Sequence, residues 1–295
     1  MSSYLISCES TADLPYAYLA SRNIPVLLYS YTVDGQTYED DMGRDPAALG
    51  RFYDLLAAGK LPQTAQINLY QYCDFFRALL RQGDVLHIAF SSALTGSVLH
   101  ARRAAEMMRE EFPDRRIIVI DSTCASVGYG LLVDCAADLR DRGAGLEEVA
   151  AWVTEQRSRV HHQFYSTDLR FFRRSGRLSG AAAMIATMLG ICPIIRASDT
   201  GHLIAYDKVR GKKNAIARTI EVMDEHATGG AQYREKCFVC HSHCPAEAEE
   251  MRDAVLAHFK NLCDVPVYEI GTVIASHTGP GTVAVVFFGD ERAPR

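Results

Sequence analysis

Short apolar runs alternate with amphipathic stretches along the first half of the chain. The run Val85–Phe90 has the length and composition of a buried strand, and beyond Gly96 the residues Val98, Ala101 and Ala105 line one helical stripe. Comparable strands are expected at 4–8, 24–33, 36–40 and 116–121, with helices at 45–58, 69–79 and 129–139. Strands that alternate with helices in this way predict a parallel sheet covered by helices.

The second half of the chain has a different pattern, in which hairpins are mixed with helices. Strands are expected at 163–167, 192–196, 202–210, 237–241, 267–270, 272–277 and 282–288. Helices are expected at 146–158, 181–189, 214–226 and 245–259, with a basic loop at 173–180. We therefore predict an α/β protein with an N-terminal parallel-sheet domain at residues 1–158 and a C-terminal α+β domain at 159–295.

Composition narrows the class of protein. The 295 residues are 48% hydrophobic and 23% charged, and the net charge of −5 argues against a general nucleic-acid surface. No apolar run approaches the ~20 residues of a membrane span, which leaves only transient contact with a membrane surface. The start MSSYLISCES lacks the features of a signal peptide, and nine scattered cysteines are typical of reduced thiols. We expect a soluble cytoplasmic protein.

Several hydroxyl-rich turns precede predicted helices. They are Ser10-Thr11, Thr64-Ala65-Gln66, Ser91-Ser92 and Asp121-Ser122. Because parallel strands end at one edge of a sheet, these turns can converge there, where open α/β sheets bind ligands. Helix N-termini and neutral hydroxyls suit a single carboxylate. The alternative is that the hydroxyls only cap helices and satisfy turns, with Thr95 as a cap.

Other motifs carry weaker signals. Gly279-Pro280-Gly281 leads into a strand, so it is not a dinucleotide-binding fingerprint, although its glycines and the nearby His277 suit a close backbone approach to a ligand. The segment Cys237–Cys244 lacks a second ligand pair at zinc-finger spacing, and we interpret its thiols as buried core residues rather than a metal site. Basic residues at 170–177 and at Arg210, Lys212 and Lys213 form either a solvated face or a patch for an acidic partner.

In these motifs the chain resembles the DegV family of bacterial fatty-acid-binding proteins, the lipid-carrying subunits of fatty-acid kinase. Seven blocks in order carry the resemblance. They are Ser10–Pro15, Thr64–Asn68, Ser91–Ser97, Asp121-Ser122, Asp168–Ser179, Val209–Lys213 and His277–Gly281. Glu9 stands where the family has Asp, and Ile67 where it has Pro.

The resemblance implies a ligand, a site and a partner. A long-chain fatty acid would place its carboxylate at Thr64, Ser91, Ser92, Arg177 and His277, with support from Ser10, Thr95, Gly96 and Gly279. Its acyl chain would lie in an apolar tunnel of the first domain. An ATP-dependent kinase subunit would phosphorylate the bound acid, and Arg210, Lys212 and Lys213 are the candidates for docking it. We expect no catalysis by this chain, no cofactor and no metal.

Two other classes of function remain as alternatives. A serine-dependent hydrolase or acyltransferase would use Ser92 as nucleophile and His277 as base, although the sequence has no G-x-S-x-G elbow. A redox or metal sensor would be built on Cys237–Cys244.

Overall fold

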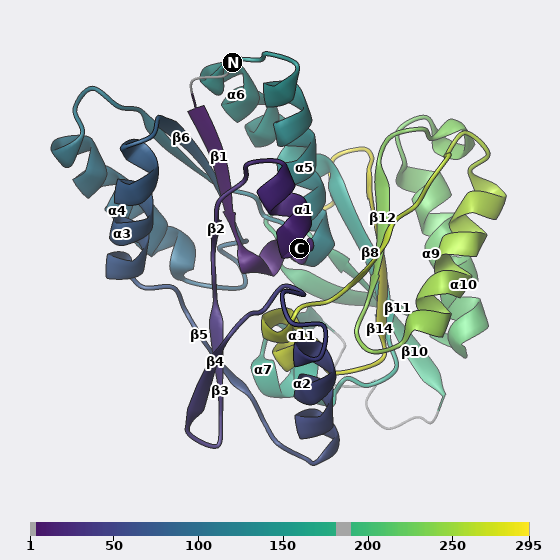
Figure 1. Cartoon of the computed structure of the whole chain (residues 1–295). Helices are drawn as coiled ribbons and strands as arrows, with labels where there is room; N and C mark the ends of the chain where they lie inside the picture. Colours follow the sequence, from purple (N-terminus) through teal and green to yellow (C-terminus); the bar gives the residue numbers. More distant parts are fainter. Residues whose placement is uncertain (1–3, 181–189, 295) are drawn as a thin grey trace.

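The strands of the protein form three sheets in a computed structural model that describes residues 4–180 and 190–294 (Figure 1). The first sheet is fully parallel, in the order β2-β1-β6-β7. Its strands are β1 (Tyr4–Glu9), β2 (Val26–Leu27), β6 (Asp84–Ala89) and β7 (Ile117–Asp121). This confirms the parallel sheet that the alternating pattern of the first half predicted.

Helices cover both faces of this sheet. They are α1 (Tyr16–Ser21), α3 (Leu69–Leu80), α4 (Ser97–Glu111), α5 (Ser126–Asp141) and α6 (Leu146–Gln156), with short 3₁₀ turns at η1 (Ser10–Ala12) and η2 (Arg157–Arg159). Asn68 caps α3 through a reciprocal capping box with Gln71. In the part of the chain that the structure describes, each helix is too short or too polar to cross a membrane.

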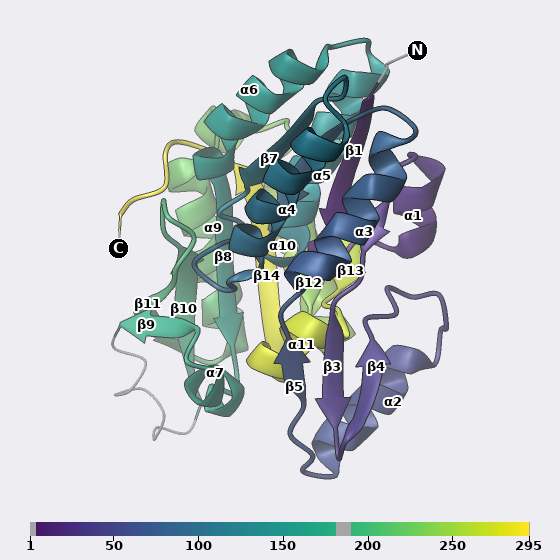
Figure 2. The ribbon, with the colours of Figure 1, turned by 90° about the vertical axis from the view of Figure 1, so that its left-hand side faces the viewer.

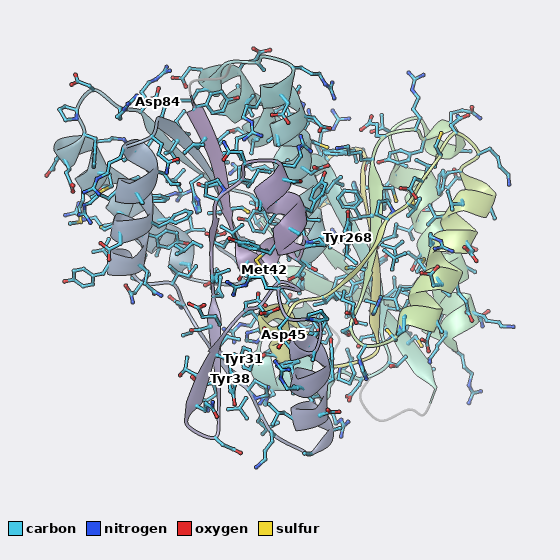
Figure 3. All side chains as sticks on the ribbon, viewed as in Figure 1. Tyr31, Tyr38, Met42, Asp45, Asp84 and Tyr268 are labelled. Carbon is cyan, nitrogen blue, oxygen red and sulfur yellow. The ribbon has the colours of Figure 1, made fainter. Side chains whose placement is uncertain are left out.

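A small antiparallel sheet extends from the first sheet, in the order β4-β3-β5. It contains β3 (Ser30–Val33), β4 (Gln36–Glu39) and β5 (Gln63–Ala65), and α2 (Ala48–Ala57) packs against it. The hairpin predicted at Asp34-Gly35 is confirmed. Figure 3 labels Tyr31 and Tyr38, whose rings stack across β3 and β4 with centroids 5.3 Å apart, while Tyr31 also meets Phe52 of α2 edge to face.

The second half builds a seven-stranded mixed sheet, in the order β13-β12-β14-β8-β10-β11-β9. Its strands are β8 (Val160–Ser166), β9 (Leu178–Gly180), β10 (Ile191–Ala197), β11 (Leu203–Arg210), β12 (Cys237–His241), β13 (Val267–Glu269) and β14 (Thr282–Phe288). The helical elements of this half are α7 (Arg170–Ser175), α9 (Lys212–His226), η3 (Gly230–Gln232), α10 (Pro245–His258) and α11 (Thr272–Thr278). Helices α9 and α10 cover the face of the sheet that is turned away from α5.

Two predictions for the second half are wrong in detail. The segment Thr272–His277, expected to be a strand, is the helix α11, in which the N–H of Ala275 donates to the carbonyl of Gly271. Its short run of β-branched and small residues does not distinguish the two structures by periodicity. The expected loop at 173–180 contains the end of α7, stopped by Gly176 at φ 67°, and the strand β9. The helix expected at 181–189 lies outside the described residues.

Helix α5 lies between the two large sheets and is buried along most of its length. Two glycines allow this position. A Cβ at Gly128 would lie 2.1 Å from Nε2 of His162 in β8, and a Cβ at Gly130 would lie 2.5 Å from the carbonyl oxygen of Ala12. Because real side chains do not tolerate such distances, these glycines let α5 approach both halves of the molecule at once.

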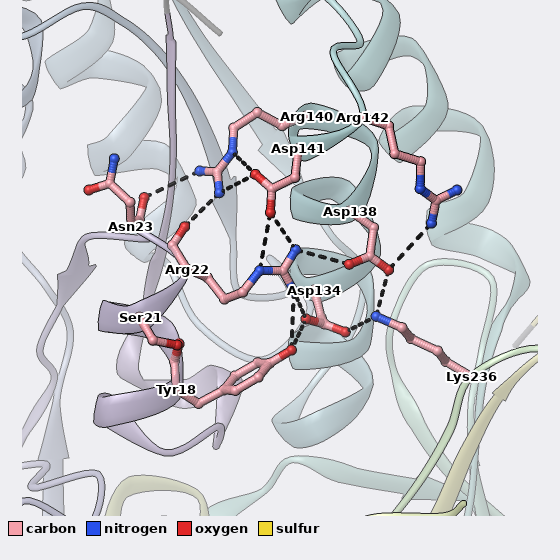
Figure 4. Close-up of polar contacts among 10 residues, drawn as sticks. All are labelled: Tyr18, Ser21, Arg22, Asn23, Asp134, Asp138, Arg140, Asp141, Arg142 and Lys236. Carbon is pink, nitrogen blue, oxygen red and sulfur yellow. Dashed lines mark hydrogen bonds and ion pairs between the residues drawn. The ribbon is translucent and has the colours of Figure 1, made fainter. Parts of the chain in front are cut away.

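An ion-pair network fastens the same helix to both halves (Figure 4). Arg22, at the end of α1, contacts Asp134, Asp138 and Asp141 on one face of α5 at 2.8–2.9 Å. Lys236, which precedes β12 in the second half, pairs with Asp134 and Asp138. Asp134 is only 1% exposed, so its charge is compensated by partners from two distant parts of the chain.

A second buried carboxylate organises the carboxyl edge of the parallel sheet. Glu9, at the end of β1, accepts hydrogen bonds from the hydroxyls of Tyr72 and Tyr129 and from the backbone N–H of Phe90. His87 of β6 lies 3.1 Å from the same carboxylate. Burial raises the pKa of Glu9, but His87 and the hydrogen bonds outweigh it, so the pKa is lower than usual and the group is ionised.

His162 makes stability depend on pH. Burial lowers its pKa to about 3, and its Nε2 accepts a hydrogen bond from the N–H of Ala125, which protonation would break. In the unfolded chain His162 binds a proton near pH 6.5, whereas in the folded protein it stays neutral. The stability that neutral His162 contributes is therefore fully present above that pH and is lost as the pH falls. Between pH 7 and pH 5 we expect His162 to remove on the order of 2 kcal/mol from the free energy of unfolding, measured with urea.

The matched comparison is the pH dependence of a His162→Leu variant. The variant should be less stable at pH 7, because Ala125 loses its acceptor, but should lose less stability on acidification. His258→Leu, at an exposed position, should keep the slope of the original protein. An unchanged slope in His162→Leu would contradict this assignment.

Candidate functional site

A cavity of about 150 Å³ lies where the small antiparallel sheet, the edge of the parallel sheet and α11 meet. Figure 2 shows α11 beside β5 in this region. The polar side chains that line the cavity are Tyr29, Thr64, Gln66, Thr95, Arg177, His277 and Thr278. The apolar ones are Ala65, Phe90, Leu94, Ala125, Phe172, Leu203, Val273 and Ile274. The lining therefore combines a set of hydrogen-bonding groups with an apolar wall.

The polar part of the lining is centred on Thr64 and His277. Thr64 is in β5, where it pairs with Tyr31 of β3. His277 comes from the last turn of α11, and its Nε2 lies 2.8 Å from the Thr64 hydroxyl oxygen. This hydrogen bond joins residues that are 213 positions apart in sequence. Because α11 is a helix rather than the expected strand, Val273 and His277 are one turn apart and line the same cavity.

The charge around His277 favours an anion. Burial, together with the nearby positive charges of Arg177 and Arg174, lowers the pKa of His277 to about 4, so the ring is neutral near pH 7. Arg177 lines the cavity and is exposed on its other side. Arg174 donates a hydrogen bond to the carbonyl oxygen of Ser276 in α11. The cavity thus has neutral donors inside and a positive charge at its rim.

Tyr29 also lines this candidate site, although no local sequence pattern singles it out. The side chain is 3% exposed, and its hydroxyl has no hydrogen-bond partner among the described residues. Burial and the neighbouring Glu9 carboxylate raise the pKa of Tyr29, so the hydroxyl keeps its proton and can donate it. A tyrosine in an apolar segment is an ordinary core residue, and only the fold reveals that this one lines the cavity.

Of the residues predicted to support the carboxylate site, some line the cavity and others lie around it. Thr95 lines the cavity, and its hydroxyl lies 3.0 Å from that of Ser97. Gly96 lies close to Gln66, because a Cβ there would be 2.8 Å from the Gln66 side-chain oxygen. Gly279 ends α11 at φ 66°, where a Cβ would lie 2.2 Å from the ring of Phe171. The positive φ and the close aromatic ring therefore require a glycine at 279, whereas at 96 the end of the Gln66 side chain could move aside.

The predicted serines lie outside the cavity lining. The Ser91 side chain is buried, and a Cβ at Gly201 would lie 2.3 Å from its hydroxyl oxygen, so it packs against the β10–β11 turn. Ser92 is exposed, and its backbone N–H donates to Asp121. Ser10 is buried and accepts a hydrogen bond from the backbone N–H of Tyr29, which fixes the short connection between β2 and β3 that carries this tyrosine.

The basic residues proposed for docking lie away from the cavity lining. Arg210, Lys212 and Lys213 are exposed at the junction of β11 and α9. Lys212 forms an ion pair with Glu247 of α10, so one of the three charges is already compensated.

The thiols of the Cys237–Cys244 segment lie in or beside the packed core of the C-terminal sheet. Cys237 and Cys240 are buried in β12, as predicted, and Cys244 is half-buried. Burial raises the pKa of both Cys240 and Cys244 to about 12. Such thiols are protonated at neutral pH and are therefore poor nucleophiles and poor metal ligands.

A larger depression of about 820 Å³ lies at the other end of the parallel sheet. It is open and is lined by residues at the amino ends of β1 and β6 together with members of the ion-pair network, including Arg22 and Arg140. Ligands of open α/β sheets bind at the carboxyl ends of the strands instead. The smaller cavity is therefore the better candidate: it can hold the anionic group of a ligand at one side and an apolar group at the other.

Comparisons with known proteins agree with the architecture. Residues 4–290 match the model of a family described as uncharacterised proteins of the DegV family. A DegV domain-containing protein of Clostridium perfringens is 32% identical over 297 residues, covering 100% of both chains.

Two solved structures have the same fold. A DegV family protein from Thermus thermophilus, whose structure is described as showing fatty-acid binding, has a TM-score of 0.86 at 28% identity over 97% of this chain and 99% of its own. A DegV lipid-binding protein from Thermotoga maritima has a TM-score of 0.83 at 26% identity over 99% and 100%. With this match over nearly its whole length, the chain belongs to the DegV family.

Proposed function

We propose that this protein binds a long-chain fatty acid and presents it to an ATP-dependent fatty-acid kinase subunit, without catalysing a reaction itself. The observation that carries the proposal is the cavity at Thr64 and His277, where hydroxyl and imidazole groups adjoin an apolar wall. The Thermus thermophilus and Thermotoga maritima relatives, described as fatty-acid-binding and lipid-binding, support it.

The carboxylate would be held by neutral donors and one cation. Thr64, Tyr29 and Thr95 supply hydroxyls, His277 supplies an imidazole, and Arg177 supplies the compensating charge. The unpartnered hydroxyl of Tyr29 gains an acceptor in this arrangement, which removes the cost of a buried unsatisfied polar group. Ser91 and Ser92 remain predicted donors, and they would have to turn toward the cavity to take part.

The acyl chain requires more space than the cavity offers. A cavity of about 150 Å³ has room for a group of roughly the size of benzene. We propose that the walls move apart as the chain passes Phe90 and Leu94 into the first domain, where the sequence predicts a tunnel. Burial of each methylene contributes about 0.8 kcal/mol, so a long chain can offset the cost of this opening.

Two features support presentation rather than chemistry by this chain. The nucleophile of the alternative hydrolase mechanism, Ser92, is exposed, while Nε2 of its proposed base His277 contacts Thr64. Arg177 is partly exposed at the rim, where a partner could reach the carboxylate. We propose that the kinase subunit docks on the exposed patch of Arg210, Lys212 and Lys213.

The first test removes one hydroxyl from the polar part of the cavity. Thr64→Val keeps the shape of the side chain but deletes the donor, and a hydrogen bond to a charged group contributes about 1.5–3 kcal/mol. We expect the Kd for palmitate, measured by isothermal titration calorimetry, to rise by about 10- to 100-fold.

The matched control for this variant is Thr37→Val. Thr37 is exposed on β4 of the same small sheet, so the same chemical change there should leave the Kd unchanged. Ser92→Ala, measured alongside, separates the two sets of donors. Loss of affinity in Ser92→Ala but not in Thr64→Val would assign the carboxylate to the serine turn and contradict the site proposed here.

The second test identifies the natural ligand. The protein is purified without added lipid, and its organic extract is analysed by mass spectrometry. We expect about one C14–C18 fatty acid per chain, because an apolar ligand buried in this way dissociates slowly. An empty protein that also fails to bind added palmitate and oleate would refute fatty-acid binding.

A further inference from the structure

Three potential metal ligands converge on the face of the C-terminal sheet that α9 covers. They are His161 of β8, His226 at the end of α9, and Asp290, two residues beyond the end of β14. Their ligand atoms lie within 4.8 Å of one another, and no other such group of three occurs among the residues that the structure describes. In sequence Asp290 is 129 residues from His161 and 64 from His226, so no spacing motif could reveal the group.

The Asp290 carboxylate is already close to both imidazole rings. The Asp290 carboxylate lies 3.0 Å from Nε2 of His161 and 3.1 Å from Nδ1 of His226. Ligands bound tetrahedrally to one zinc ion at about 2.0–2.1 Å stand only slightly farther apart than this. The three groups therefore need small adjustments, rather than a rearrangement of the fold, to share an ion.

The backbone around the three residues is fixed by hydrogen bonds. The N–H of Asp290 donates to the carbonyl of His226, and the N–H of Gly289 donates to that of Arg159. Gly289 allows this convergence, because a Cβ there would lie 2.4 Å from the carbonyl oxygen of His226 and 2.9 Å from the His161 ring. The φ angle of Gly289 is not positive, so it is the lack of a side chain that the site requires.

The side chains combine one rigid ligand with two adjustable ones. His161 is 5% exposed and stacks on the ring of Phe287, whereas the His226 and Asp290 side chains are 39% and 58% exposed. The two imidazole rings lie 5.2 Å apart and nearly parallel, so His226 must rotate to point Nδ1 at a shared ion. Its exposure leaves room for this rotation.

One change of tautomer would prepare the buried His161 ring for a metal, because its proton lies on the nitrogen that would bind the ion. Its Nε2 now lies 3.0 Å from the carbonyl oxygen of Asp290, to which it donates its proton. On metal binding that proton moves to Nδ1 of the same ring, and the carboxylate of Asp290 supplies the negative charge. The positive charge of Arg292 also acts on His161 and opposes a cation, and its guanidinium is held by a hydrogen bond to Thr123.

We propose that His161, His226 and Asp290 form a binding site for one Zn²⁺ ion, with water as the fourth ligand. Two imidazole nitrogens and one carboxylate form a ligand set that binds zinc in preference to magnesium or calcium. A bound ion would fasten the segment after β14 to β8 and α9. That segment carries Arg292, which contacts Thr123 in the turn after β7, so the ion would stabilise the contact between the two halves of the chain.

The experiment measures Zn²⁺ binding to the full chain after treatment with a chelator and gel filtration. Competition with a chromophoric chelator should give one Zn²⁺ per chain, and Co²⁺ should give the intense visible bands of a tetrahedral site. His226→Ala should weaken Zn²⁺ binding by about 100-fold or more, since loss of a direct ligand exceeds the 10–100-fold typical of its hydrogen-bond partners. Asp290→Asn, at an exposed side chain, should weaken it as well.

The matched control is His258→Ala. His258 lies 3.4 Å from Asp224, and both side chains are 39% exposed, but no third ligand is grouped with this pair among the described residues. This variant should bind Zn²⁺ as the original protein does. Circular dichroism and the unfolding temperature in chelator show whether each variant folds, and Zn²⁺ should raise the unfolding temperature only when the site is intact. No saturable Zn²⁺ binding, or equal losses in His226→Ala and His258→Ala, would overturn the proposal.

Discussion

The hydrogen bond between Thr64 and His277 is the contact on which the candidate site depends. It joins the small antiparallel sheet of the first half to the helix α11 near the end of the chain. Neither residue has a ligand-binding environment by itself, because β5 is a short edge strand and α11 has only two turns. Where they meet, hydroxyl, imidazole and guanidinium groups surround one end of an apolar cavity.

That meeting point is fixed by the packing of α5 between the two large sheets. Gly128 and Gly130 bring this helix against both halves, and Asp134 binds Arg22 from one half and Lys236 from the other. Arg22 lines the depression at the amino ends of β1 and β6, whereas the cavity lies beyond the carboxyl ends of β6 and β7. Ion pairs at one end and a small cavity at the other are compatible with the opening of the walls that we propose.

Much of the fold could be predicted from the sequence, because the parallel sheet and the hairpins rest on local patterns. The segment at 272–278 could not, since a short run of β-branched and small residues fits either a strand or a helix, and pairing between distant strands decides which one forms. The site was predicted in part. Thr64, Thr95, Arg177 and His277 lie together, whereas Tyr29 was missed and Ser92 lies outside the lining. Whether a hydroxyl in a turn faces a cavity or solvent depends on tertiary packing that no local pattern encodes.

The most direct test of the central claim follows the ligand's own carboxyl group. Palmitate labelled with ¹³C at the carboxyl carbon, bound to the protein, gives a resonance whose pH titration reports the environment of that group. Because Arg177 and the surrounding donors stabilise the ionised form, we predict a pKa below the usual range for a carboxylic acid, and a marked change in His277→Gln. A bound carboxyl group that titrates as in water, with no response to His277→Gln, would contradict the account.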